Sequence, residues 1–291
     1  MLSAGQPFLV ELKPFEVLPE DERRKRLGAY LEFLRARDGS PDVRAKTLSK
    51  REQFFQEISQ NPVRWKGPIE RDQFRAYLNK KADASVDKKV LWLLACAKSN
   101  IAENYGVALD LRLKGDHYGS EGDEFYTFID LEEFYHTRIL KDVVRVFGIE
   151  FELGLPRMFT RFFTELVVRS PFNLRIVTAL CGELFGSVIF QLLWECADVF
   201  ADEPAVLERI RMLLREILVD EMGHVAFGHA NVGPVTHKLM RAMLPAVARH
   251  FLSDFPEFAI LGGGRQKVYE RVLAFDLARN DRLWKTHAAA A

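Results

Sequence analysis

Residues 218–229 read LVDEMGHVAFGH, and residues 130–140 read DLEEFYHTRIL. Each stretch contains a glutamate three residues before a histidine, and the two pairs are Glu221 with His224 and Glu133 with His136. Side chains three residues apart share one face of a helix, so the members of each pair could bind a metal ion together. One such pair is a weak signal, but two pairs in largely apolar stretches predict helices that meet at a polar site.

The rest of the chain predicts an all-α fold. Segments rich in Leu, Phe, Ala, Glu, Lys and Arg at helical spacing alternate with Gly and Pro, while strand patterns are scarce. Four long helices are expected, and Pro171 and Pro204 suit the first position of the last two. Their ranges are 86–114, 123–147, 171–200 and 204–228. Shorter helices are expected over residues 20–37, 45–60, 70–81, 234–251 and 266–284.

The connections predict how the four long helices are arranged. The short segments 115–122 and 201–203 favour two antiparallel hairpins, whereas residues 148–170, with an amphipathic stretch at 156–169, favour a long crossover. We therefore expect a bundle over residues 86–233, an N-terminal helical extension over 1–85, and C-terminal helices over 234–291 that pack on the bundle. Together these parts are expected to form one compact domain.

Two more glutamates, Glu103 and Glu183, interrupt apolar helical stretches, where a lone buried carboxylate is costly. In a hairpin, two residues meet only if they lie equally far from the turn. Glu183 and Glu221 are each about 17 residues from their turn, or roughly 26 Å, and Glu103 and Glu133 are each roughly 15 Å from theirs. Both pairs should therefore meet. Glu195 and Asp110 lie only about 5 and 4 residues from their loops and fail this test.

These residues together resemble the ligand set of the ferritin-like di-iron carboxylate superfamily, in its oxygen-activating branch. The resemblance covers about half of the chain, residues 86–228. It implies a four-helix bundle that holds two metal ions on the residues Glu103, Glu133, His136, Glu183, Glu221 and His224. It also implies that Asp220, in the Asp-Glu-x-x-His form, supports a ligating histidine from outside the ligand set.

The charge balance agrees with this interpretation, because four carboxylates offset two divalent ions while the imidazoles bind as neutral ligands. Iron is the first choice of metal, and Mn/Fe or Mn/Mn pairs are the alternatives. The resemblance implies an enzyme that uses dioxygen as co-substrate, with an external electron donor, to hydroxylate, desaturate or oxygenate a small apolar or aromatic molecule. A ferroxidase or metal-binding protein without an organic substrate is the alternative, and a pocket beside the metals would favour the enzyme.

The subgroup stays open. Ribonucleotide reductase small subunits usually have a radical tyrosine where this chain has Leu140, and arylamine N-oxygenases have a third histidine where it has Ile217. The ligand-binding oxidases related to the reductase subunit form a cross-link through a valine at the position of Tyr105. None of these three roles is therefore supported.

The sequence leaves the roles of several residues near the predicted site undecided. Glu132 could replace Glu133 as a ligand, and His229 could add an imidazole, although a surface or capping role suits it better. Space for dioxygen or substrate would explain three helical glycines, Gly182, Gly186 and Gly223, since each costs roughly 1 kcal/mol relative to alanine. Some aromatic residues could line a pocket, although core packing is expected for most of them: Tyr105, Phe134, Tyr135, Phe185 and Phe227.

Composition limits the partners. Lys plus Arg equals Asp plus Glu at 41 each, so no global field would attract nucleic acid. No export signal is apparent, and Glu183, Gln191, Glu195 and Asp198 interrupt the apolar stretch 176–200, which argues against a membrane span. The cysteines Cys96, Cys181 and Cys196 form no CxxC pair and are expected to be reduced core thiols. We expect a cytoplasmic protein with a small-molecule substrate, compatible with a homodimer.

Overall fold

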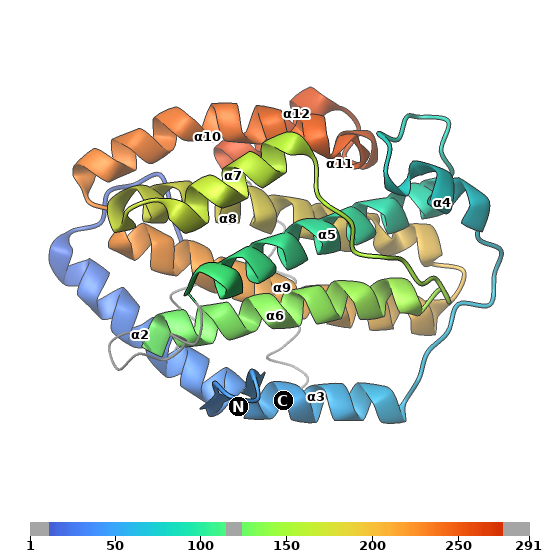
Figure 1. The fold of residues 1–291 in the computed structure, drawn as a ribbon, viewed down its shortest axis with the longest axis horizontal. Helices are drawn as coiled ribbons and strands as arrows, with labels where there is room; N and C mark the ends of the chain where they lie inside the picture. The colour runs from blue at the N-terminus through green and yellow to red at the C-terminus, as the bar shows by residue number, and fades with distance from the viewer. Residues whose placement is uncertain (1–11, 115–123, 276–291) are drawn as a thin grey trace.

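A computed structural model describes residues 12–114 and 124–275, and these residues are mostly helical, as the sequence predicts (Figure 1). The four long helices are α5 (Lys88–Lys114), α6 (Glu124–Arg145), α8 (Phe172–Cys196) and α9 (Pro204–Asn231). The helices before them are α2 (Glu20–Asp38), α3 (Ser49–Gln60) and α4 (Arg71–Leu78). The other helices are α7 (Met158–Arg169), the 3-10 helix η1 (Ala197–Phe200), α10 (Pro234–Asp254), α11 (Pro256–Leu261) and α12 (Arg265–Ala274).

Some predicted boundaries are wrong. The helix expected over residues 45–60 begins at Ser49, because a small antiparallel hairpin of β1 (Pro41–Asp42) and β2 (Thr47–Leu48) precedes it. Asp42 stabilises the turn, since its carboxylate accepts hydrogen bonds from two backbone N–H groups. The last turn of the helix expected over 171–200 is the 3-10 helix η1. The loop at 115–122 and residues beyond 275 of the helix expected over 266–284 lie outside the described residues.

The long helices pack against one another in sequence pairs. Helix α5 lies along α6, α8 lies along α9, and the two pairs meet through contacts of α6 with α9 and of α5 with α8. Helix α7 belongs to the long crossover and packs on α5, α8 and α10. On the opposite side, α2 packs on α9 and leads through the hairpin to α3 (Figure 1).

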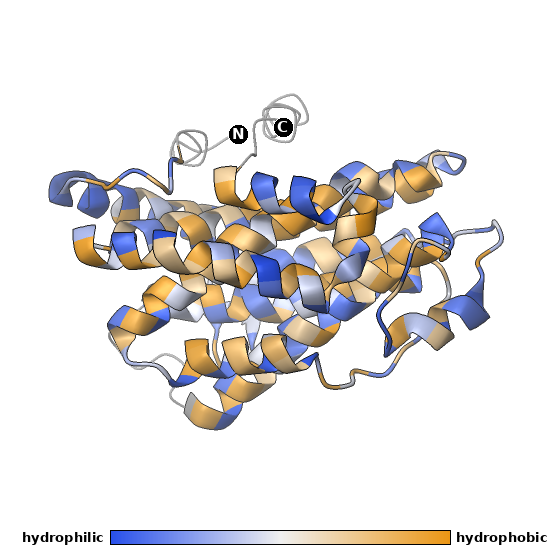
Figure 2. Cartoon of the chain, turned by 90° about the horizontal axis from the view of Figure 1, so that it is seen from above, coloured by the Kyte–Doolittle hydropathy of each residue, from blue (hydrophilic) through white to orange (hydrophobic). Residues whose placement is uncertain are grey.

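Helix α8 is central to the core. Apolar residues dominate its sequence and most of them are buried, whereas hydrophilic residues gather at the start of α2 (Figure 2). Residues Phe172–Phe200 are long and apolar enough to cross a membrane by length and composition alone, but 78% of their apolar window is buried inside the protein. Such burial is typical of a core helix. Of the three thiols, Cys96 and Cys181 are buried, whereas Cys196 is only partly buried.

Candidate metal centre

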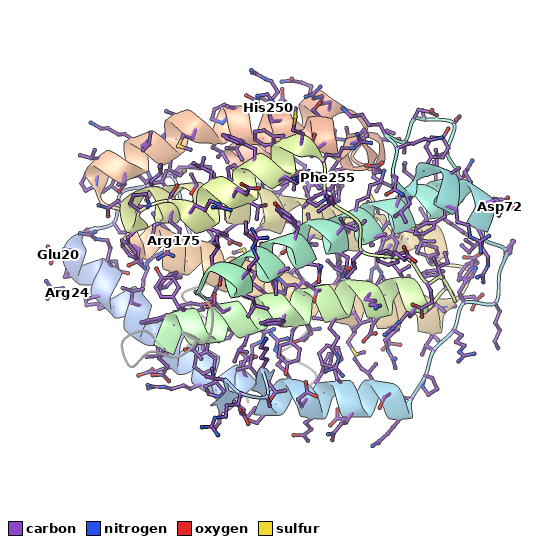
Figure 3. The ribbon with its side chains drawn as sticks, viewed as in Figure 1. Glu20, Arg24, Asp72, Arg175, His250 and Phe255 are labelled. Atoms are coloured by element: carbon purple, nitrogen blue, oxygen red, sulfur yellow. The ribbon has the colours of Figure 1, made fainter. Side chains whose placement is uncertain are left out.

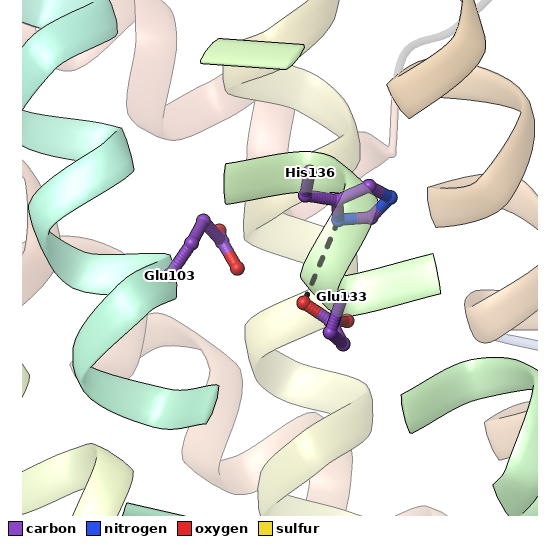
Figure 4. Close-up of side chains that lie close together, drawn as sticks. All are labelled: Glu103, Glu133 and His136. Carbon is purple, nitrogen blue, oxygen red and sulfur yellow. Dashed lines mark ion pairs between the residues drawn. The ribbon is translucent and has the colours of Figure 1, made fainter. Parts of the chain in front are cut away.

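All six residues predicted to bind metal lie together inside the bundle. Each of the four long helices contributes to them, with Glu103 on α5 and Glu183 on α8. Ligand atoms of Glu103, Glu133 and His136 lie within 4.8 Å of one another, and so do those of Glu133, Glu183 and His224. Figure 4 shows the first group, in which Glu133 and His136 form an ion pair while Glu103 points toward them from the neighbouring helix.

Glu133 lies between the two histidines. Its Oε2 atom is 3.5 Å from Nδ1 of His136, and its Oε1 atom is 3.3 Å from Nδ1 of His224. Glu221 Oε1 lies 3.6 Å from the first of these nitrogens, and Glu183 Oε2 lies 3.5 Å from the second. The imidazole ring centroids are 5.6 Å apart. The cluster therefore has two lobes, with one imidazole in each and Glu133 shared between them.

Each histidine also contacts a carboxylate on the side facing away from the cluster. His136 Nε2 lies 3.2 Å from Asp220 Oδ2, and His224 Nε2 lies 3.0 Å from Glu132 Oε2. The Nε2 N–H of each ring can donate to this carboxylate, so Nδ1 of each ring faces the cluster and is the atom that could bind a metal ion. The role expected of Asp220 matches this contact.

Glu132 is placed outside the cluster, and its role was missed from the sequence. It was weighed only as a substitute for Glu133, yet it contacts His224 on α9, just as Asp220 on α9 contacts His136 on α6. The signal was present, because Glu132 directly precedes Glu133 as Asp220 directly precedes Glu221. Each acidic residue supports the histidine of the other helix.

Two arginines, one buried and one partly buried, hold these outer carboxylates. Arg37 on α2 and Arg51 on α3 both donate hydrogen bonds to Asp220 Oδ1. Both also contact Glu216, at 3.0 and 2.8 Å, and they lie 3.7 and 4.0 Å from Glu132. Burial alone would raise the pKa of Asp220, but the two guanidinium groups hold it well below its usual range. No sequence pattern indicates these arginines, which come from the segment expected to be an N-terminal extension.

The ligand carboxylates repel one another. Burial, followed by the charge of neighbouring carboxylates, raises the pKa of Glu103 and Glu221 well above the usual value. Burial would lower the pKa of His136 and His224, but the surrounding carboxylates raise it well above 6.5. Without a cation, the cluster therefore retains protons that bound metal would displace.

Unpaired atoms in the cluster fit a metal site. Three buried atoms, His136 Nδ1, His224 Nδ1 and Glu221 Oε2, have no hydrogen-bond partner among the described residues. Such atoms are rare in proteins and need an explanation. Imidazole nitrogen and carboxylate oxygen are donors that suit iron and manganese. A pair of these ions on the six residues would satisfy all three atoms.

The glycines differ in what they provide. A Cβ atom at Gly186 would lie 2.6 Å from Glu221 Oε2, so this glycine leaves room for a ligand carboxylate. Gly182 faces Phe163 and, like Gly186, lines a cavity. The expectation that Gly223 gives space for dioxygen or substrate is wrong, because Tyr30 of α2 fills that space and a Cβ atom would lie 2.6 Å from its ring.

A cavity of about 300 Å³ adjoins the cluster. Its lining includes five of the six predicted ligands, with His136 as the exception, and side chains of α5 to α10. Most of the wall is apolar, and of the aromatic residues singled out in the sequence only Phe185 and Phe227 contribute to it. His229 lies apart from the cluster and is buried rather than at the surface, where its Nε2 donates a hydrogen bond to the Glu16 carbonyl at 2.6 Å.

No family model, curated protein or solved structure matches this chain. The site must therefore be interpreted from its own geometry.

Proposed function

We propose that this protein is a ferritin-like di-metal oxidoreductase that uses dioxygen to oxidise a small, largely apolar organic molecule. The single observation that carries the proposal is the cavity, because one continuous wall contains both the carboxylate and imidazole cluster and a large apolar surface. A pocket that is mainly apolar, with a few convergent polar groups, is typical of a small-molecule site. A ferroxidase or metal-binding protein, the alternative, has no use for such a pocket.

In this proposal the six clustered residues hold two iron ions, with Mn/Fe or Mn/Mn as alternatives. Glu133 would contribute to holding both ions, because each of its oxygens faces a different imidazole. When bound, the ions supply the electrons and Lewis acidity needed to activate dioxygen. An external electron donor would restore the reduced ions after each turnover.

The surrounding residues have separate tasks. Asp220 and Glu132 fix the tautomer and ring orientation of the histidines, which keeps both Nδ1 atoms directed into the cluster. Phe163, Phe185 and Phe251 line the cavity and exclude water from the space where the substrate would lie. The substrate is thus held next to the ligand carboxylates in an apolar environment.

The test begins with metal content. The protein is loaded anaerobically with ferrous iron, and its iron content and absorption spectrum are measured before and after exposure to oxygen. Wild type should bind about two irons per chain, as in other di-iron bundles, and should show an oxygen-dependent absorption change. Glu183→Ala should lose both properties, whereas the control Glu208→Ala, at an exposed position on the neighbouring helix α9, should retain them.

Folded protein that binds no stoichiometric metal would refute the proposal. Rapid oxygen uptake could instead depend on iron alone and stay the same when apolar organic compounds are added. That result would support the ferroxidase alternative.

A further inference from the structure

One end of the cavity differs from the rest. Arg175 on α8, Tyr126 on α6 and Asp110 on α5 all line it. Each lies seven or eight residues from the ligand glutamate of its own helix, in the direction of the same end of the bundle. At 1.5 Å per residue, this end is about 10–12 Å from the ligand carboxylates. Figure 3 shows Arg175 well separated along the bundle from Phe255, another residue of the cavity wall.

The Arg175 guanidinium forms no ion pair with any of the described residues. Its Nε atom is buried without a hydrogen bond, and its one described interaction is with the Tyr126 ring, whose centroid lies 5.7 Å from Cζ. Asp110 and Asp130 also line the cavity, but each has interactions of its own and neither forms an ion pair with Arg175. A half-buried cation without a partner is unfavourable unless an anion binds beside it.

The walls between this cation and the metal cluster are apolar. They include Val107, Ile129, Val167 and Ala179. A guanidinium presents a planar fork of N–H donors that matches a carboxylate. The cavity is at the small end of the range for ligand pockets, which leaves little room for a larger anionic group.

We infer that the substrate is an elongated organic acid whose carboxylate binds Arg175. Its apolar body fills the cavity, and the carbon to be oxidised lies at the far end from the acid group, next to Glu183 and Glu221. This inference rests on the proposed function, and it adds the substrate class and the residue that anchors the substrate.

Binding measurements test it on protein loaded anaerobically with ferrous iron. The probes are straight-chain carboxylic acids of roughly eight to twelve carbons, which span the ~12 Å between the anchor and the cluster, with the primary amide and the amine of each length. Calorimetry gives the affinities for wild type, Arg175→Gln and Arg175→Lys. Arg169→Gln is the matched control, because Arg169 is exposed and its ion pair within the described part of the chain is with Glu165.

In wild type and in the control, the acid should bind at least about tenfold more tightly than the amide, as expected for a charge-assisted contact. Arg175→Gln should remove this preference, and Arg175→Lys should restore part of it. Equal binding of acid and amide in wild type, tighter binding of the amine, or an acid preference that survives in Arg175→Gln would each overturn the inference. The last result would mean that the acid binds elsewhere, for example to the metal ions.

Iron content measured on the same samples separates this inference from the proposed function. If the variants bind iron at the wild-type level but Arg175→Gln leaves the preference for acid over amide unchanged, the substrate assignment is overturned and the proposed function is not. Absence of iron from every variant would overturn the proposed function.

Discussion

The cluster of carboxylates and imidazoles has two contrasting sides. Toward α2 and α3, charged groups interlock, because Arg37 and Arg51 contact Asp220, Glu132 and Glu216 in a buried network. Toward α7 and α8, the cluster meets a cavity with apolar walls. The first side fixes the orientation of the ligands, and the second leaves space for a molecule to react. A site that needs both rigid ligands and an open position is expected to divide these tasks.

The N-terminal segment forms part of the charged side of the cluster. Helices α2 and α3 belong to the segment expected to be an N-terminal extension, yet they supply the arginines that neutralise the outer carboxylates. The two sides should therefore respond differently to mutation. Changes on the charged side should affect folding as well as metal binding, whereas changes on the cavity side should affect mainly the site.

The largest effect is expected from Arg51→Met. Arg51 is 3% exposed, and its loss would leave Asp38 and Asp220, which are both buried, with fewer compensating charges. Removing one partner from a buried charge network typically costs about 3–5 kcal/mol. The free energy of unfolding, measured by urea denaturation, should fall by this amount, and the thermal midpoint should fall by roughly 10 °C.

The matched control is Arg35→Met on α2. Arg35 pairs with Glu124 at the surface, with a side chain 56% exposed, and such pairs contribute about 0–1 kcal/mol. Equal effects of the two substitutions would show that the buried network is not the stabilising feature we describe.

The second prediction concerns pH and metal removal. The pKa values of Glu103, Glu221, His136 and His224 are raised in the folded protein. A group with a raised pKa stabilises the folded state below its unfolded pKa and loses that contribution as pH rises through the folded pKa. The metal-free protein should therefore lose stability as pH rises above about 4.5 for the glutamates and about 6.5 for the histidines.

The expected slope is roughly 1–2 kcal/mol per pH unit for each proton that only the folded state retains. Asp220 has the opposite sign, since its pKa is depressed, but its contribution is already complete above its unfolded pKa of about 4. Thermal denaturation between pH 5 and 8, with and without ferrous or manganous ions, measures the effect. Metal-loaded protein should show a much flatter curve, and parallel curves would contradict the prediction.

The third prediction tests how the outer carboxylates act. Glu132→Gln preserves shape but replaces the carboxyl group that contacts His224 Nε2 with an amide. Loss of such a partner typically lowers metal affinity about 10- to 100-fold. Affinity is measured by competition with a chelator, and the tautomer of His224 by ¹⁵N NMR. Reduced affinity with an unchanged tautomer would argue against the positioning role. Glu208→Gln, at an exposed site, serves as the control.

Helix geometry explains why much of the site could be predicted. The rise per residue of a helix is constant, so equal distances from a turn were enough to match Glu183 with Glu221 and Glu103 with Glu133. An acidic residue also directly precedes Glu133 and Glu221 in the sequence. Of these two residues, Glu132 and Asp220, a supporting role for a histidine was predicted only for Asp220. The pattern of the sequence thus contained the residues that the structure brings together in the cluster and the two acidic residues that contact its histidines.

The arginines could not be found in this way. Arg37 and Arg51 lie 183 and 169 residues from Asp220 in the sequence, and their placement depends on how α2 and α3 turn back onto the bundle. The tight turn of the connecting hairpin accepts its hydrogen bonds at the Asp42 carboxylate and includes a positive φ at Lys46. Neither feature creates a periodic pattern. For the same reason Gly223 was assigned to dioxygen or substrate, when a side chain from α2 occupies the space.

The smallest effect is expected at the two glycines that flank Glu183 on the cavity side. Gly186→Ala would place a methyl group 2.6 Å from Glu221 Oε2, so the carboxylate must move and metal affinity should fall. Gly182→Ala would place one 3.4 Å from Phe163, an ordinary contact, and alanine favours the helix by up to about 1 kcal/mol. Calorimetric titration with ferrous ions measures the metal affinity of each variant, and urea denaturation measures its stability.

Gly182→Ala and Gly186→Ala add the same methyl group to the same helix, one turn apart. Comparing them therefore separates the effect of crowding Glu221 from the effect of altered helix packing. If Gly182→Ala reduces metal affinity as much as Gly186→Ala does, the effect comes from disturbance of α8 rather than from contact with Glu221. If neither does, Glu221 has freedom to move on this side of the cluster. The cavity side would then allow Glu221 to move. The charged side, in contrast, restricts movement, because a carboxylate holds each histidine there.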